Sequence, residues 1–354
     1  MSSKDLNEAE ATVEATFGAR RASPLIVLLL AAAAALCALV SLLPHNAYVR
    51  FQQLRDTIQF HAQWVYERIE LDPTPIDMAV VGNSRLEAGV SAPELQALLR
   101  AQGQGGLHVA NLSMPQEGRN IHYVIVKRLL EKHPEVKTLI VSVVEQQPRT
   151  GHPAFRYLAD ADDVALAPMF VNMDYAGDLA TLPYRQMSLW AQSRAPEAFG
   201  DTATLSKAYE GTDRDTTLTF TLPDGRVVDR DRIVPLPKIA ADAEAVINSG
   251  HGQLLPASMI DTEYAIERTY TRRIAALAKA HGVRLIFLRL PVYSDTRPVA
   301  DEPFYRQFGQ VWTADFLSSD YTLYSDYGHL NRRGVKMLTP WLAEQLAKPP
   351  EAQP

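Results

Sequence analysis

Residues 76–85 read IDMAVVGNSR, and the organisation of the chain can be worked out from this stretch. The apolar run at 76–81 has the length of a buried strand, and Gly82 permits the close turn that ends it. Residues 93–100 follow with the apolar spacing of a helix and a proline in its first turn. A strand, a turn and a helix in this order form the first unit of a parallel α/β sheet.

The same alternation continues along the chain. Short apolar runs predict further strands, and longer runs with helical spacing predict further helices. Such alternation is typical of a parallel sheet covered by helices on both faces, so the predicted fold class is three-layer α/β. We expect strands at 107–112, 137–144 and 283–290, and helices at 121–132, 263–281 and 331–347.

Residues 149–262 differ from the segments on either side of them. They are rich in proline, aspartate and threonine, and their apolar periodicity is weak. Residues 217–222 and 226–228, separated by Pro-Asp-Gly, predict a β-hairpin. We interpret the region as an insertion over one edge of the sheet. It can be a lid or substrate platform, or it can be a structural excursion without a role in binding.

An uncharged segment lies at residues 24–43. About 20 residues at 1.5 Å each match a bilayer core of about 30 Å, so we expect a transmembrane helix. Arg20 and Arg21 stand just before the segment, and the first arginine after it is Arg50. The positive-inside rule then places residues 1–23 in the cytoplasm as a disordered tail, and the rest outside. A cleaved signal peptide is the alternative.

The remaining boundaries follow from these segments. Residues 44–75 are expected to form a juxtamembrane helix, which continues to about residue 70, and a linker broken by Asp72-Pro-Thr-Pro75. The globular domain then covers residues 76–348, including the insertion. The single cysteine, Cys37, lies inside the apolar segment, so the chain has no intrachain disulfide.

Composition excludes several classes of protein. The chain has 354 residues, of which 47% are hydrophobic and 21% charged, with a formal net charge of -6. No dense basic patch is present, which argues against nucleic acid as a partner. The histidines are scattered without metal-ligand spacing, and residues 103–106 (GQGG) read as a linker and not as a phosphate loop. We therefore expect neither a metal nor a cofactor.

Two short motifs carry the chemistry. Ser84 follows the first strand, and ligands of open α/β sheets bind at the carboxyl ends of strands. Its alternative role is to cap the next helix. Asp326-Tyr-Gly-His329 precedes the last helix, with a spacing that lets the carboxylate accept from the imidazole Nδ1–H and leaves Nε2 for a serine proton. Alone, His329 can equally be a solvated loop residue.

Together the two motifs resemble those of the SGNH, or GDSL-like, hydrolase superfamily. The resemblance rests on Gly82-Asn83-Ser84 and on Asp326-xx-His329, and it covers residues 76–148 and 263–347, about half of the chain. It implies a flavodoxin-like parallel sheet. It also implies a catalytic triad in which Ser84 is the nucleophile, His329 the base and Asp326 the residue that orients the base.

The other blocks of that superfamily are altered in this chain. Val109-Ala-Asn-Leu-Ser113 resembles the second block, which implies that the backbone N–H of Ser113 joins that of Ser84 in the oxyanion hole. Serine stands there in place of the usual glycine. The third block usually provides an asparagine, but the strand here continues into Glu145-Gln146-Gln147, which leaves the amide of Gln146 as the candidate third donor. Asn83 replaces the usual aspartate.

The strings GNSRLEAGVSAPELQALL and ANLSMPQEG are similar to those of one branch of the superfamily, the membrane-anchored proteins that acylate cell-envelope polymers. Examples act in D-alanylation of teichoic acids and O-acetylation of alginate. The resemblance implies a single-pass protein of the cytoplasmic membrane with its SGNH domain in the periplasm or outside the cell.

The function expected from this resemblance is acyl transfer, most simply of acetyl groups, to a cell-envelope polysaccharide, or hydrolysis from it. A multi-pass membrane acyltransferase would be its partner. The alternative is a catalytically silent scaffold that docks on such an enzyme, which the altered third block keeps open. A distance above about 5 Å between Ser84 Oγ and His329 would favour the scaffold.

Overall fold

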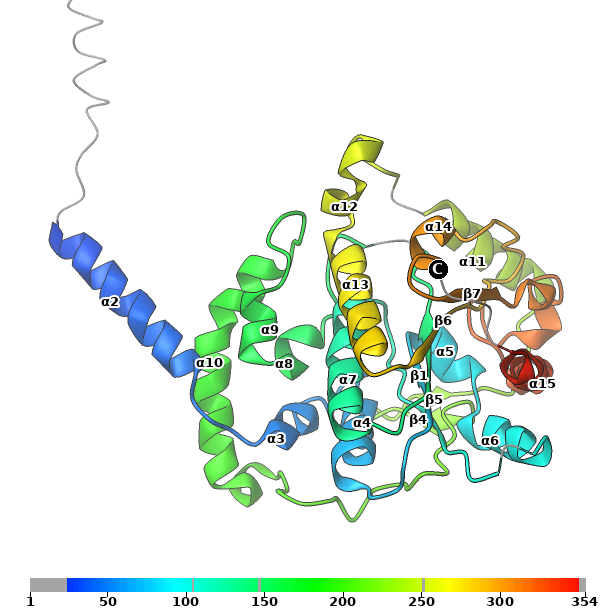
Figure 1. The fold of residues 1–354 in the computed structure, drawn as a ribbon, viewed down its shortest axis with the longest axis horizontal. Coiled ribbons are helices and arrows are strands. Elements are labelled where there is room, and N and C mark those ends of the chain that lie inside the picture. Colours follow the sequence, from blue (N-terminus) through cyan, green and yellow to red (C-terminus); the bar gives the residue numbers. More distant parts are fainter. Residues whose placement is uncertain (1–23, 104, 146–147, 250–251, 350–354) are drawn as a thin grey trace, which may run out of the picture.

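The computed structural model describes residues 24–103, 105–145, 148–249 and 252–349. Its centre is a five-stranded sheet with the order β2-β1-β3-β6-β7, in which every neighbouring pair is parallel (Figure 1). The strands are β1 (Met78–Val81), β2 (Val109–Asn111), β3 (Thr138–Ser142), β6 (Arg284–Arg289) and β7 (Gln310–Thr313).

Counted within this sheet alone, the strand order is 2-1-3-4-5. That is the order of flavodoxin-like doubly wound sheets, in which the chain winds first to one side of the first strand and then to the other. The α/β class and the parallel sheet predicted from the sequence are confirmed. The topological switch point lies at β1, which pairs with β2 on one side and β3 on the other.

Helices cover both faces of the sheet. Ala79 and Val81 of β1 belong to one apolar core, and Met78 and Val80 belong to a second core on the opposite face. This alternation follows from the two-residue period of a strand, and it makes the sheet the middle of three layers. The first face is covered by α7 (Arg119–Lys132) and α13 (Ala265–Ala280), and the second by α5 (Ser84–Gly89), α6 (Ala92–Ala101) and α15 (Arg332–Ala347).

The strands and helices predicted around the insertion are confirmed within a few residues at each end. The fifth strand, β7, was not predicted. It has only four residues and pairs with β6 alone at the edge of the sheet, and its last two residues are only partly buried. The strand is short, lies at the edge of the sheet and begins with Gln310, so the sequence contains no apolar run that would predict it.

Residues 44–70, which follow the uncharged segment, do not form one helix, so that prediction is wrong. This segment folds as α3 (Ala47–Gln52), α4 (His61–Tyr66) and a π-helical turn at Glu67–Leu71, joined by turns. Tyr48, Phe51 and Val65 are each at most 1% exposed, because they are part of the first core. Packing against the domain therefore determines the path of the chain here. The apolar side chains at helical spacing do not form one side of a single long helix.

The insertion contains the predicted hairpin and several helices that were not predicted. Phe220 pairs with Val228 in the antiparallel hairpin of β4 (Phe220–Thr221) and β5 (Val227–Val228). The helices are α8 (Phe155–Leu158), α9 (Ala161–Ala165), α10 (Tyr175–Arg194), α11 (Leu236–Asn248) and α12 (Ile260–Glu263), and a short α14 (Glu302–Tyr305) follows the insertion.

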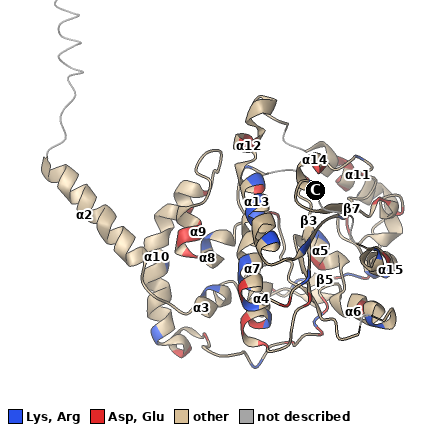
Figure 2. Ribbon diagram, in the orientation of Figure 1, with Lys and Arg blue, Asp and Glu red and all other residues tan. Residues whose placement is uncertain are grey.

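Helix α2 (Pro24–Ser41) projects from the globular body (Figure 1). None of its 18 residues is buried, and none carries a charge, as Figure 2 shows. At 1.5 Å per residue it is about 27 Å long, enough to cross a membrane, although signal sequences have the same properties. Its last residue, Ser41, accepts a hydrogen bond from Gln186 of α10 at 3.0 Å. The tail at 1–23 lies outside the described residues.

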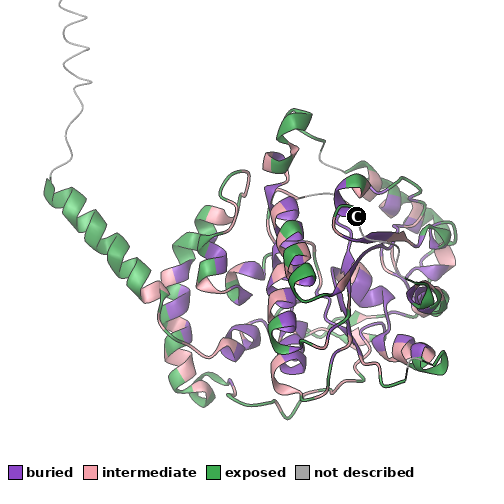
Figure 3. Ribbon diagram, viewed as in Figure 1, coloured by how far each residue is buried: buried purple, intermediate pink, exposed green. Residues whose placement is uncertain are grey.

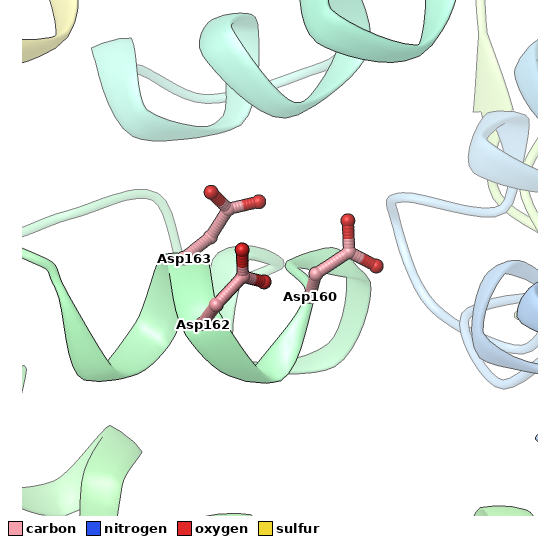
Figure 4. A group of neighbouring side chains, drawn as sticks. All are labelled: Asp160, Asp162 and Asp163. Atoms are coloured by element: carbon pink, nitrogen blue, oxygen red, sulfur yellow. The ribbon is translucent and has the colours of Figure 1, made fainter. Parts of the chain in front are cut away.

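Three aspartates cluster at the start of α9 (Figure 4), with one carboxylate oxygen of each within 4.8 Å of the others. Cations of the chain pair with two of them. Asp160 lies 2.6 Å from Arg50 and 3.2 Å from Lys127, which also lies 3.0 Å from Asp163. Because Arg50 belongs to α3 and is 1% exposed, these ion pairs hold the segment after α2 against the insertion.

Asp160→Asn should lower the melting temperature at pH 7, and the loss should shrink in acid. Burial raises the pKa of Asp160, but the charge and hydrogen bond of Arg50 and the charges of Arg128 and Lys127 outweigh it and lower the pKa to about 2. A depressed pKa contributes stability above the unfolded pKa of about 4, which is lost as the pH falls toward the folded pKa. Thermal melts of the detergent-solubilised chain between pH 7 and pH 3 measure this.

Asp162→Asn is the matched control, because Asp162 is an exposed member of the same cluster. Its melting temperature should follow that of the unmodified chain at every pH. An Asp160→Asn variant as stable as the control at pH 7 would contradict the role of this ion pair.

Candidate active site

Ser84 stands at the carboxyl end of β1, at the switch point of the sheet, where it is the first residue of α5. The turn that positions it depends on Gly82. A Cβ added at Gly82 would lie 2.6 Å from a methyl group of Leu86 and 2.9 Å from the Cβ of Ser142. Glycine therefore lets α5 begin directly above the ends of β1 and β3.

The helix cap at this turn is Asn83, and not Ser84. The side-chain oxygen of Asn83 accepts a hydrogen bond from the backbone N–H of Arg85 at 3.1 Å. The alternative in which Ser84 serves as an N-cap is therefore wrong. Its hydroxyl instead lies 2.8 Å from Nε2 of His329.

The segment Asp326–His329 forms a tight turn just before α15. Oδ1 of Asp326 accepts hydrogen bonds from the backbone N–H groups of Gly328 and His329, each at 2.9 Å. The backbone N–H of Ser325 donates to the carbonyl of His329 at 2.9 Å and closes the turn. This local geometry brings the carboxylate of Asp326 to 2.8 Å from Nδ1 of His329.

The electrostatics of this turn fix the tautomer of His329. Burial raises the pKa of Asp326, but the hydrogen bond and charge of His329 and the two backbone N–H donors lower it well below its usual range. The carboxylate is therefore ionised and can only accept, so Nδ1 carries the ring proton. Nε2 of the neutral ring then has its lone pair free for the hydroxyl of Ser84.

The structure thus brings Ser84, Asp326 and His329 together, although Ser84 and His329 are 245 residues apart in sequence. His329 is 22% exposed and Asp326 is 30% exposed, so solvent reaches the group. The nucleophile, base and orienting carboxylate of a serine-dependent acyl transfer have this order of hydrogen bonds.

The structure describes two of the three predicted oxyanion donors, Ser84 and Ser113. The N–H of Ser84 lies in the first turn of α5, where helical N–H groups have no partner in the helix. The N–H of Ser113 donates to the side-chain oxygen of Asn111 at 3.1 Å, so it is already engaged within its own turn. Gln146 lies outside the described residues.

The second motif has a structural role that the sequence did not reveal. Asn111, at the end of β2, donates its amide N–H groups to the carbonyls of Leu86 at 2.9 Å and Val90 at 2.8 Å. These carbonyls lie at the end of α5, and the carbonyl of Leu86 also accepts from the backbone N–H of Val90 at 3.1 Å. Asn111 therefore braces the short helix that carries Ser84.

A partly buried ion-pair network next to Ser84 in the chain was also missed. Glu145, just after β3, lies between the guanidinium groups of Arg85 and Arg289 and forms ion pairs with both. Arg289, at the end of β6 and 2% exposed, also pairs with Asp315 at 2.9 Å and Asp295 at 3.1 Å. Charged residues follow three neighbouring strands here. Because the carboxyl ends of parallel strands meet at one edge of the sheet, this pattern could have predicted the network from the sequence.

A pocket with about 130 Å³ of space borders this network. Arg85, Glu145 and Arg289 form one wall, and Val246 and Ile247 at the end of α11 form another. Arg85, the residue after Ser84, lines this pocket, whereas Ser84 itself does not. The insertion therefore supplies part of the wall of this cavity, and its role as a lid or substrate platform stays a prediction.

The insertion also contacts the turn that contains Asp326 and His329. Nε of Arg232 donates to the carbonyl of Ser325 at 2.6 Å, directly before Asp326. The hydroxyl of Thr216 donates to the carbonyl of Glu87 in α5 at 2.6 Å. The same segment thus contacts both the helix of the serine and the turn of the histidine.

A scan against protein-family models and a search of curated proteins find no match to this chain. The assignment of the site depends on its geometry and on the resemblance described above.

Asn83→Ala should lower the free energy of unfolding by about 1 kcal/mol, because it removes the cap of α5. Ser84→Ala should change it by less than about 0.5 kcal/mol, since its hydroxyl bonds only across the site and not within the helix. Chemical denaturation of both variants measures the difference. A larger loss for Ser84→Ala than for Asn83→Ala would reverse the assignment of the cap.

Proposed function

We propose that this chain is a serine-dependent O-acyltransferase or esterase of the SGNH type. The observation that carries the proposal is the hydrogen-bonded series from Ser84 Oγ to His329 Nε2 and from His329 Nδ1 to Asp326, each contact 2.8 Å long. The doubly wound sheet, with Ser84 after its first strand and His329 before its last helix, supports the same superfamily.

In the first half of the reaction, Ser84 Oγ attacks the carbonyl carbon of an ester. His329 Nε2 takes the hydroxyl proton, and ionised Asp326 stabilises the imidazolium that forms. The N–H of Ser84 donates to the negative oxygen of the tetrahedral intermediate. The intermediate collapses as the alcohol leaves with the proton from His329, and the acyl group remains as an ester on Ser84.

In the second half, an acceptor attacks the acyl-serine. His329 removes a proton from the acceptor hydroxyl and returns it to Ser84 as the new ester forms. A sugar hydroxyl as acceptor gives a transferase, and water gives an esterase. The pocket of about 130 Å³ next to Arg85 has room for a small acyl group such as acetyl, since a water molecule occupies about 30 Å³.

The proposed location is the outer face of the cytoplasmic membrane, with α2 as a single span. Arg20 and Arg21 precede α2, and the first arginine after it is Arg50, which favours a cytoplasmic N-terminus. The domain would then meet cell-envelope polysaccharides but not cytosolic acyl donors. A multi-pass membrane acyltransferase that carries acyl groups across is therefore the proposed partner.

The scaffold alternative receives no support from the site. A silent domain has no need to keep the serine hydroxyl within hydrogen-bond distance of a histidine, and the contact at 2.8 Å is far below the limit of about 5 Å at which the scaffold would be favoured. The altered third motif is better explained by Glu145, which orders Arg85 and Arg289 at the place of the usual asparagine.

Ser84→Ala should abolish covalent labelling of the solubilised chain by a fluorophosphonate and lower hydrolysis of an aryl acetate by at least about a thousandfold. His329→Ala should lower hydrolysis by a similar factor, because the proton then has no acceptor. Asp326→Asn should cost less than His329→Ala, since the aspartate only orients and stabilises. Full activity of Ser84→Ala would remove it as the nucleophile.

A reporter fused after Pro354 should be active only if it is of the kind that folds outside the cytoplasm. The reason is the arginine pair on one side of the uncharged segment. Paired fusions of alkaline phosphatase and of a cytoplasm-only fluorescent protein measure this, with fusions after Ser23 as the opposite control. Fluorescence of the Pro354 fusion would overturn both the orientation and the action on envelope polymers.

A further inference from the structure

Helix α10 has an inverted distribution of polarity. Its charged residues Asp178 and Arg185 are each 8% exposed, although charges on a surface helix normally face solvent. Asp178 pairs with Arg156 at 3.0 Å, and Arg185 donates to the carbonyl of Arg156 at 2.5 Å. Arg194, the last residue of α10, is exposed, but Asp178 and Arg185 face the protein. The opposite side of the helix carries other residues.

That opposite side is apolar. Six large side chains on α10 and on the loop before it are from 50% to 77% exposed, and together they are called the apolar face here: Leu166, Met169, Phe170, Met173, Tyr184 and Met187. Within residues 164–193, all of which the structure describes, the charged residues are Asp174, Asp178 and Arg185, and none of them is exposed. A stretch of thirty residues with many exposed apolar side chains and no exposed charge is unusual for a protein in water.

The apolar face is continuous with the proposed membrane anchor. Figure 1 shows α2 meeting α10 near the middle of the longer helix, and Figure 3 shows α2 exposed over almost its whole length. Gln186, on the turn of α10 next to Met187, donates to the carbonyl of Ser41 at the end of α2. The point where the anchor would leave the bilayer therefore lies directly against α10.

Several contacts hold α10 in place relative to the anchor. The backbone N–H of Asn46 donates to Ser193 at 2.8 Å, and Gln53 donates to Gln192 at 3.2 Å. Arg50 adds its ion pair with Asp160 at the start of α9. Because α3 follows α2 after a few residues, the apolar face keeps a fixed orientation near the membrane surface.

We infer that the apolar face docks on the lipid bilayer, with its side chains in the outer leaflet beside the point where α2 emerges. The inference rests on the proposed anchoring by α2. Tyr184 and Trp190 provide the amphipathic rings that favour a membrane interface, and Arg194, at the end of α10 and 5.3 Å from the ring of Trp190, can reach lipid phosphates. A bilayer also accepts scattered apolar side chains that do not form a pocket.

The docking has a consequence for the site. A single anchor helix would allow the domain to swing freely, whereas a second contact fixes the tilt of the domain relative to the membrane. The insertion that carries the apolar face also contacts the catalytic turn through Arg232. The distance of Ser84 from the membrane would then be constant, as a protein that receives acyl groups from a membrane partner requires.

Site-specific quenching tests the inference with the full chain. Cys37→Ser gives a chain without cysteine, because Cys37 is the only one in the sequence. Phe170→Cys and Met187→Cys then place a fluorophore on the apolar face, and Leu30→Cys places one inside α2. Met337→Cys is the matched control, because Met337 is 48% exposed on α15, at the opposite end of the molecule from α2 in Figure 1.

Each labelled chain is reconstituted into vesicles of phosphatidylethanolamine and phosphatidylglycerol containing a lipid with a nitroxide on its acyl chain. We expect quenching at positions 170 and 187 to be several-fold stronger than at 337 and weaker than at 30, because an interfacial residue lies about 5–10 Å deep. Thermal melting against the Cys37→Ser parent identifies any variant that does not fold. If one of the variants at positions 170 and 187 fails to fold, the other one still tests the inference.

The outcomes separate the inference from the proposal on which it rests. Quenching at 30 with no more at 170 and 187 than at 337 overturns the docking but leaves the anchor, and it assigns the apolar face to a protein partner. No quenching at 30 removes the anchor. In that case, quenching at 170 and 187 keeps bilayer docking as a peripheral contact, and its absence overturns both.

Discussion

The parallel pairing of β1 with both β2 and β3 is the constraint on which the site depends. Because these strands run in one direction, their carboxyl ends meet at one edge, and side chains that follow different strands become neighbours. Ser84 follows β1, Asn111 ends β2 and Glu145 follows β3. Asn111 then holds the far end of α5, and Glu145 holds Arg85, so the serine sits on a helix that is fixed from two strands.

The histidine depends on a different and more local constraint. The carboxylate of Asp326 accepts from two backbone N–H groups of its own turn and from the ring of His329, so four residues contain everything needed to orient the base. The long-range part is the packing of α15 in the second core, which brings that turn above β1. The turn itself is local, and only the packing of α15 is needed to bring it to Ser84. This explains why Ser84 Oγ and His329 Nε2 lie 2.8 Å apart although the two residues are distant in sequence.

These two constraints explain what could be predicted from the sequence. The sequence predicted Ser84, Asp326 and His329 as site residues because each of their motifs can be read within four residues. The strands were predictable because their apolar runs are long. The roles of Asn111 and Glu145 were not, since they depend on which strand ends lie side by side. The helix α10 was missed for another reason: several of its apolar residues, such as Tyr184 and Met187, face outward, while its Asp178 and Arg185 are buried together with Leu182 and Leu189. A search for helices that bury their apolar residues finds only weak apolar periodicity in this segment.

The insertion contacts both the segment after α2 and the turn that contains Asp326 and His329. One end of it, α8–α10, holds the segment after α2 through Arg50 and Asp160, and another part holds the catalytic turn through Arg232. Side chains of α11 meanwhile form a wall of the pocket beside Arg85. An acyl-transfer domain that was attached to the membrane only through one helix would need none of these contacts. If the reaction requires an acyl group to pass from a membrane partner to Ser84, the position of the serine relative to the bilayer matters, and the insertion is the part of the chain that can set it.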